Sequence, residues 1–225
     1  MKNNVNLEDL ETAYSYKSNR QLKFTYFIFN ILQNQKLVKL LIAFTNGILK
    51  YNLPFKIFIK KTVFNVFCAG EDINDAFLKI KYLEKFKVKS VLDYVSEGEN
   101  NSESFDNNTN IIVSNIIRLG KECPGNYVSV KITGLENPKF LTYCNGMKFV
   151  NDLIILPRFD RLINRIDLIC KTAHASKIIV FIDAEDRCMQ DLFDEITETM
   201  MEKYNTEYAV VFNTLQMYLK DRLEY

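Results

Sequence analysis

Apolar side chains in the first sixty residues recur at the spacing of a helix. Leu22, Tyr26 and Phe29 follow one another at intervals of four and three residues, which places them on one face. Because an amphipathic helix packs such a face against another element, we expect it to be buried against the rest of the chain rather than docked on a membrane surface. Pro54 then interrupts the pattern. Residues 1–60 are therefore predicted to form an N-terminal helical arm.

From residue 62 onward, short apolar runs alternate with amphipathic segments. Runs rich in Val and Ile are typical of the buried strands of a parallel sheet, in which helices connect consecutive strands. Helical spacing is clearest in segments 73–85, 109–118 and 188–204, whereas the polar stretch 97–110 predicts a surface loop. The predicted strands are 63–68, 90–94, 127–132, 177–182 and 208–212.

This alternation predicts an α/β fold. A complete eight-unit barrel needs roughly 250 residues, so about five βα units form only part of one. An open doubly wound sheet would fit the length, but its first turn normally carries a glycine-rich motif, and the turn CAGED has a single glycine. We therefore expect a (βα)8 TIM-barrel type fold over residues 61–225, incomplete and preceded by the N-terminal arm.

Composition and charge narrow the function classes. Apolar residues make up 48% of the chain and charged residues 25%, which is ordinary for a globular protein. The net charge of +1 provides no field that attracts nucleic acid, so no nucleic-acid partner is expected. The apolar windows are shorter than a membrane span, and the N-terminus is too polar for a signal peptide. These features predict a cytoplasmic protein.

Cysteine and histidine content argues against disulfide and metal chemistry. The five cysteines are scattered and form no CxxC pair, which predicts reduced thiols rather than a disulfide framework or a zinc site. His174 is the single histidine, which leaves little scope for a catalytic triad or a His-rich metal centre. We therefore expect no metal.

Candidate chemistry lies where the apolar runs end, because active sites of parallel α/β folds lie at the carboxyl ends of strands. Lys131 follows one run, and a buried lysine needs an anion, either a neighbouring carboxylate or a ligand. A lysine that merely extends its ammonium to solvent is the alternative. Asp183 ends the next run and is the candidate to pair with a cation, whereas Glu185 or Asp186 is expected to cap the following helix.

The last apolar run ends in amides. Asn213 and Gln216 each offer a donor and an acceptor, which suits recognition of the edge of a heterocycle. A satisfied hydrogen-bond network inside a barrel is the alternative. Together, the three strand ends predict a site that binds an anionic small molecule.

These strand ends belong to segments that resemble the proline dehydrogenases, most closely the bacterial single-function form. The likeness covers about residues 60–225, and five segments occur in the family's order. The segments are FCAGED (67–72), SVLDYVSEG (90–98), VSVKITGL (128–135), VFIDAED (180–186) and VVFNTLQMYLKDRLEY (210–225).

The resemblance implies oxidation of L-proline to 1-pyrroline-5-carboxylate, with hydride passing to FAD and electrons then passing to a quinone. It implies that Lys131 binds the substrate carboxylate and that Asp183 is a catalytic residue. It further implies that Ala184 and Gln216 bind the cofactor. A peripheral contact with the inner face of a bacterial membrane would bring the enzyme to its quinone.

The sequence stops soon after the fifth predicted strand, whereas the family's later strands carry further flavin contacts and paired arginines that bind the carboxylate. We therefore expect weak FAD binding and little activity from this chain alone, unless a complementing C-terminal fragment supplies the remaining strands. A catalytically inactive remnant that acts only as an interaction partner is the alternative. A different barrel enzyme that binds a phosphate ligand is a third interpretation.

Overall fold

The computed structural model describes residues 6, 8–50, 60–94, 101–145 and 156–225. It has two compact units, Met1–Val88 and Lys89–Tyr225, which are described separately. The division predicted from the sequence, into an arm over residues 1–60 and a partial barrel over residues 61–225, stays a prediction.

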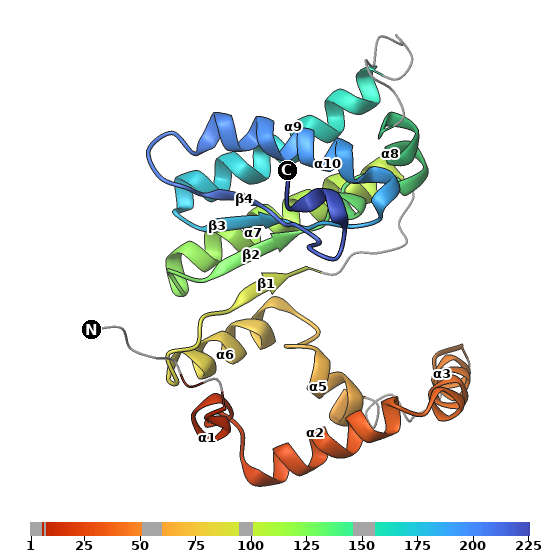
Figure 1. Ribbon diagram of the computed structural model, residues 1–225. Helices are drawn as coiled ribbons and strands as arrows, with labels where there is room; N and C mark the ends of the chain where they lie inside the picture. Colours follow the sequence, from red (N-terminus) through yellow and green to blue (C-terminus); the bar gives the residue numbers. More distant parts are fainter. Residues whose placement is uncertain (1–5, 7, 51–59, 95–100, 146–155) are drawn as a thin grey trace. The chain divides into compact units, whose positions relative to one another are not determined.

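The described part of the first unit is helical. Ser18 begins the second helix with a capping box, in which its hydroxyl accepts from Gln21 N at 3.3 Å and its own N donates to Gln21 Oε1 at 2.8 Å. Asp72 caps the last helix by accepting from Asn74 N at 2.8 Å. The elements are α1 (Leu10–Ala13), α2 (Asn19–Leu32), α3 (Gln35–Lys50), a π-helical turn (Lys60–Phe64), α5 (Asn65–Phe67) and α6 (Ile73–Glu84) (Figure 1).

One prediction for this unit is wrong. The run 63–68 is helical rather than a strand, and Cys68 N donates to Phe64 O at 2.8 Å in the bond that closes a helical turn. A short apolar run fits a strand and a packed helical turn equally well, and local packing decides between them. The helical spacing of α2 is confirmed, and its apolar stripe is not buried within the first unit, where Tyr26 is 70% and Phe29 is 50% exposed. The expected burial of this stripe against the rest of the chain stays a prediction. Residues 51–59, including Pro54, lie outside the described residues.

The second unit is built on a four-stranded parallel sheet in the order β1-β2-β3-β4. In a βα barrel, neighbouring strands follow one another in sequence order, as they do here. In a doubly wound sheet, the strand order instead reverses at a switch point. The barrel-type prediction is therefore confirmed over the doubly wound alternative. The strands are β1 (Val91–Asp93), β2 (Tyr127–Val130), β3 (Ile179–Ile182) and β4 (Val211–Asn213), each shorter than predicted.

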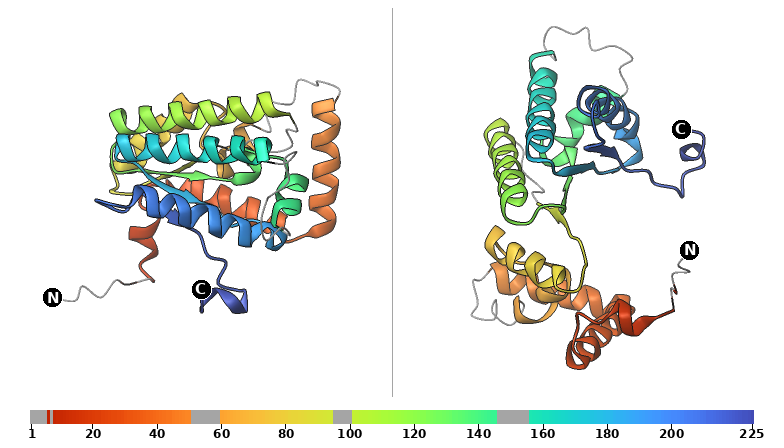
Figure 2. Two further views of the ribbon diagram at one scale, coloured as in Figure 1. Left: turned by 90° about the horizontal axis from the view of Figure 1, so that it is seen from above. Right: turned by 90° about the vertical axis from the view of Figure 1, so that its left-hand side faces the viewer.

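Helices cover one face of this sheet. Val128 and Val130 of β2 and Val180 and Ile182 of β3 alternate with less buried neighbours and are at most 3% exposed. Helix α7 packs on α9, α9 packs on α10 and β3, and α10 packs on β4 (Figures 1 and 2). The helices are α7 (Ser102–Glu122), α8 (Pro138–Asn145), α9 (Leu156–Ser176) and α10 (Arg187–Tyr204), with short 3-10 turns at Ile132–Gly134 and Lys220–Arg222.

The polar stretch predicted as a surface loop contributes the first turns of α7. Asn101 caps this helix by accepting from Ser104 N at 2.8 Å. Phe105 and Thr109 are 2% and 3% exposed, so the helix buries one face here despite its polar composition. The prediction was wrong for residues 102–110 because this segment is rich in Asn and Ser and has too few apolar residues for a helical spacing to be recognised. Residues 95–100 lie outside the described part of the chain.

Candidate functional site

The register of the sheet gathers the strand-end side chains on one face. Asp93, Ser129 and Phe181 are paired across β1, β2 and β3. Lys131 and Asp183 each lie two residues beyond this row, and strand alternation returns them to the same face. The buried valines lie on the opposite face, against the helices. Lys131 therefore lies on the face that becomes the interior when such a sheet closes into a barrel, as the sequence predicted.

Lys131 lies between two carboxylates. Its Nζ is 2.8 Å from Asp93 Oδ2 and 3.7 Å from Asp183 Oδ2. The hydrogen bond to Asp93 is the main reason why the pKa of Lys131 is raised, and burial opposes it. The side chains of Lys131, Asp93 and Asp183 are 31%, 37% and 26% exposed, so solvent and ligands reach the cluster. The prediction that Lys131 has an anion beside it and that Asp183 pairs with a cation is confirmed.

Sequence reasoning missed Asp93, although it supplies the shorter of the two contacts with Lys131. The signal was present, because Asp93 ends the apolar run of β1 just as Asp183 follows that of β3. The same rule about the carboxyl ends of parallel strands identifies both.

Buried side chains hold the turn that follows Lys131. Asn108 Nδ2 of α7 donates to Gly134 O at 2.9 Å, and Arg165 Nη1 of α9 donates to Leu135 O at 2.9 Å. Asn108 and Arg165 are 2% and 4% exposed. Two helices therefore fix the backbone directly after the lysine, which restricts where its ammonium can lie.

Glu185 contacts the end of β2 and does not cap α10. Its carboxylate accepts from Thr133 N at 3.1 Å and also from the Thr133 hydroxyl. Burial raises the pKa of Glu185, and the bonds from Thr133 oppose this shift. Asp186 is the N-cap residue by position, but its side chain accepts no hydrogen bond from the helix. The predicted cap is therefore wrong for both residues, and the carboxylate of Glu185 instead takes its donors from the turn that follows β2.

The two amide side chains at the end of β4, Asn213 and Gln216, differ from each other. Asn213 is engaged on both sides, donating to Asp194 Oδ1 at 3.0 Å and accepting from Thr214 N at 2.8 Å. It thus belongs to an internal network, which was the alternative to a ligand contact. Gln216 differs, because its Oε1 is buried and has no hydrogen-bond partner within the described parts of the chain. A buried carbonyl oxygen without a donor is uncommon in proteins and suits a ligand N–H.

The predicted site residues are only partly brought together. Lys131 and Asp183 form one cluster, and Ala184 follows Asp183 directly in the link from β3 to α10. Among the hydrogen bonds and ion pairs of the described residues, none joins Gln216 to Lys131 or Asp183. Gln216 shares the carboxyl edge of the sheet with them, three residues after β4.

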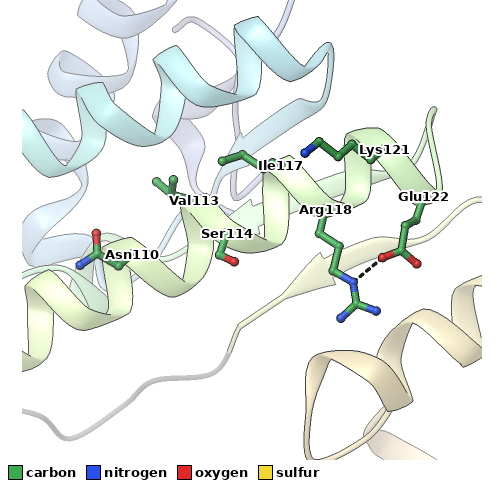
Figure 3. Close-up of a pocket in the computed structure, with 7 residues that line it drawn as sticks. All are labelled: Asn110, Val113, Ser114, Ile117, Arg118, Lys121 and Glu122. Atoms are coloured by element: carbon green, nitrogen blue, oxygen red, sulfur yellow. Dashed lines mark hydrogen bonds and ion pairs between the residues drawn. The ribbon is translucent and has the colours of Figure 1, made fainter.

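A pocket elsewhere in this unit has a different character. Its residues recur along one side of α7 at helical spacing, as Figure 3 shows, and they include none of the predicted site residues. Arg118 and Glu122 pair there at 2.5 Å as neighbours one helical turn apart. The lining residues are Asn110, Val113, Ser114, Ile117, Arg118, Lys121 and Glu122.

The described residues show no disulfide, metal-binding or membrane-spanning feature. None of the five cysteines forms a disulfide, and the residues that the structure describes contain no group of three or more His, Cys, Asp or Glu side chains placed to hold a metal ion. Within those same ranges, no helix combines the length and apolar character needed to cross a bilayer.

Sequentially ordered parallel strands with charged side chains at their carboxyl edge define a barrel-type α/β protein, a class whose enzymes place their sites at this edge. Comparison with known protein families agrees with this class and identifies the family. A sequence model described as proline dehydrogenase matches residues 76–225, and the chain belongs to this family.

Individual relatives carry the same description. The chain is 28% identical to "Proline dehydrogenase 1, mitochondrial" of Dictyostelium discoideum, over 96% of this chain and 45% of that protein. It is 25% identical to "Probable proline dehydrogenase, mitochondrial" of Schizosaccharomyces pombe, over 86% of this chain and 49% of that protein. The chain therefore spans less than half the length of these curated relatives.

A solved structure shares the fold. Proline utilization A (PutA) from Bdellovibrio bacteriovorus, inactivated by N-propargylglycine, superposes with a TM-score of 0.60 at 20% identity. The match covers 95% of this chain and 23% of that one. At this level of identity the likeness shows a common fold, of TIM-barrel type.

Proposed function

We propose that this chain belongs to an FAD-dependent enzyme that oxidises L-proline to 1-pyrroline-5-carboxylate and passes the electrons to a quinone. The observation that carries the proposal is the Lys131 ammonium at the carboxyl edge of the sheet, 2.8 Å from Asp93 and 3.7 Å from Asp183. The family match over residues 76–225 and the names of the relatives supply the substrate.

The charges of this cluster complement an amino acid zwitterion. Lys131 would bind the carboxylate of proline by a charge-assisted hydrogen bond. Its contact with Asp93 keeps the ammonium protonated, because the pKa of Lys131 is raised. Asp183 would lie beside the secondary ammonium of the substrate as the catalytic carboxylate. Binding both charges of proline orients the ring, which is the main task of the protein when a cofactor performs the redox chemistry.

The residues present fit a flavin. Oxidation of proline to 1-pyrroline-5-carboxylate removes a hydride from the ring CH2 carbon bonded to nitrogen and a proton from that nitrogen. Bound FAD would supply the two-electron acceptor. Gln216 offers a buried Oε1 without a donor, which suits the N–H of a flavin ring. Ala184, directly after Asp183, has a side chain small enough for a flat ring to approach the strand end.

The proposed quinone acceptor requires a peripheral contact with a membrane, and α2 and α3 have suitable side chains. Residues 19–50 contain five basic residues and no acidic one. Tyr26, Phe27 and Phe44 are 70%, 57% and 63% exposed in these helices. Exposed aromatic side chains together with positive charge are typical of helices that lie on anionic bilayers.

The decisive experiment is a visible absorbance spectrum of the purified chain mixed with FAD, freed of unbound flavin, before and after anaerobic addition of L-proline. A retained flavin band that bleaches with L-proline and not with D-proline supports the proposal. A chain that is folded by circular dichroism but retains no flavin contradicts flavin binding by this chain alone and leaves its membership of the proline dehydrogenase family unchanged. A retained band that does not bleach supports flavin binding and contradicts proline oxidation.

A further inference from the structure

A partly buried hydrogen-bond network connects the ends of three strands. It starts after β2 with Thr133, whose N donates to Glu185 after β3 at 3.1 Å. Glu185 N then donates to Gln190 Oε1 at 3.2 Å, and Gln190 Nε2 donates to Asp194 Oδ1 at 2.8 Å. Asn213, the last residue of β4, completes the connection by donating to the same Asp194 oxygen at 3.0 Å.

Asp194 is the centre of this network. Besides the two amides at Oδ1, its Oδ2 accepts from Arg222 Nη1, so the carboxylate receives donors from α10, β4 and the turn beyond β4. Asp194 and Arg222 are 5% and 6% exposed. The reaction proposed above uses neither residue. A buried ion pair is weak support for stability alone, because desolvation offsets the attraction, and this points to a role in fixing geometry.

Two successive backbone turns connect Arg222, the partner of Asp194 in the ion pair, to Gln216. Leu219 N donates to Gln216 O at 3.0 Å, and Arg222 N donates to Leu219 O at 3.3 Å. Arg222 thus anchors a compact segment that begins at Gln216, while Asn213 anchors the strand before it. Asp194 is the shared acceptor of both anchors.

We propose that Asp194 is a positioning residue that fixes the segment 214–222, and with it Gln216, relative to the end of β3. Asp194 lies on α10 and acts through Asn213 and Arg222, without touching substrate or cofactor. The proposal rests on the proposed function in one respect, which is that Gln216 contacts the flavin. Its structural part, the fixing of the segment, holds independently of any ligand.

The test compares Asp194→Asn with Asp191→Asn in the full chain. Asp191 is on the same helix, and its 68% exposed side chain pairs with Arg222 at 3.9 Å, beyond hydrogen-bond distance. Its variant therefore makes the same charge change without removing a hydrogen-bond acceptor of the network. Hydrogen exchange of segment 213–222 is measured without flavin, and FAD affinity is measured by flavin fluorescence. For D194N we expect exchange at least about tenfold faster in this segment, unchanged exchange in the centre of α7, and about tenfold weaker FAD binding. For D191N we expect less than about twofold changes in both.

Several results would overturn the proposal. Unchanged exchange of segment 213–222 in D194N would show that Asp194 does not fix it. Faster exchange that extends through α7 would indicate general destabilisation, and faster local exchange with unchanged FAD affinity would exclude a positioning role. If D194N does not fold, Arg222→Gln, which leaves Asp194 its two amide donors, is expected to give the same local pattern. If the wild-type chain binds no flavin, flavin binding by this chain alone is contradicted, and exchange alone decides whether Asp194 fixes the segment.

Discussion

At the scale of single residues, the charge on Lys131 is what the candidate site most depends on. Asp93 and Asp183 flank the ammonium, and the raised pKa of Lys131 keeps it charged across the physiological range. A permanently charged ammonium that is about one-third exposed can bind an anionic ligand without first losing a buried partner. The carboxylate of the substrate would therefore add to the cluster rather than replace a member of it.

Lys131→Ala is expected to weaken the binding of L-proline or a carboxylate analogue by about 10- to 100-fold. The reason is that a hydrogen bond to a charged group contributes about 1.5–3 kcal/mol. Isothermal titration calorimetry of the flavin-loaded chain measures the change. Lys171→Ala, at an exposed lysine of α9, is the matched control and is expected to bind like the wild type. Equal affinity in K131A would exclude Lys131 from the substrate site.

Glu185 gives the stability a defined pH dependence. Burial raises its pKa above the ordinary 4.5, so the folded state holds the proton more tightly than the unfolded state. The stability that this group contributes is present at low pH and is lost as the pH rises through the folded-state pKa. Glu185→Gln keeps an oxygen that accepts from Thr133 but cannot ionise. Relative to the wild type, its free energy of unfolding should increase between about pH 4 and pH 7. Urea unfolding at a series of pH values measures the difference, and a constant difference would contradict the assignment.

At the scale of elements, a close approach between α7 and α9 depends on one glycine. A Cβ at Gly120 would lie 2.8 Å from the backbone oxygen of Ser176, which cannot move aside as a flexible side chain can. Gly47 of α3 is also helical, and a Cβ there would have no atom of the described residues within 4 Å. The two positions thus differ in packing and not in secondary structure.

Gly120→Ala is expected to destabilise the chain by about 1–3 kcal/mol, because the clash outweighs the better helix propensity of alanine. Gly47→Ala is expected to stabilise it by up to about 1 kcal/mol, since only propensity changes there. Chemical denaturation of both variants measures these effects. A stabilising G120A would show that the helices can separate without loss.

The exposed aromatic side chains of α2 and α3 predict binding to lipid. The full chain should cosediment with vesicles that contain phosphatidylserine and much less with neutral phosphatidylcholine vesicles, because the five basic residues of segment 19–50 add electrostatic attraction. Phe44→Asp, at a 63% exposed position, should reduce the bound fraction several-fold. Equal binding of both vesicle types, or none, would contradict this contact.

Sequence reasoning was most reliable where apolar periodicity and strand-end chemistry agree. It located the four parallel strands of the described sheet, α6 and α10, an anion beside Lys131 and a cation beside Asp183. It failed for the run 63–68, because six residues are too few to separate strand from helix, and for the polar start of α7. It could not find the network around Asp194, because donors from three segments that are distant in sequence meet there only after folding.

At the scale of the whole molecule, the cysteines fall into an exposed group and a buried group, which are expected to differ in reactivity. Cys68 and Cys188 are exposed, whereas Cys123, Cys144 and Cys170 are buried. Burial raises the pKa of Cys144, and it raises that of Cys170 to about 12. Burial protects all three of these thiols sterically, and the raised pKa of Cys144 and Cys170 also protects them chemically, since the thiolate is the reactive form.

Brief treatment of the folded chain with a maleimide should therefore modify two thiols per molecule, and all five should react in denaturant. Intact-mass spectrometry counts the adducts. More than two adducts on the folded chain would show that the core opens on the timescale of labelling.

Each compact unit carries one of the two exposed thiols, Cys68 in Met1–Val88 and Cys188 in Lys89–Tyr225. The native sequence thus provides a ready-made pair of attachment points for spin labels or a fluorophore couple. Labels on these two thiols allow the distance between the two compact units to be measured without any substitution. The same measurement with and without a ligand would report whether that distance changes.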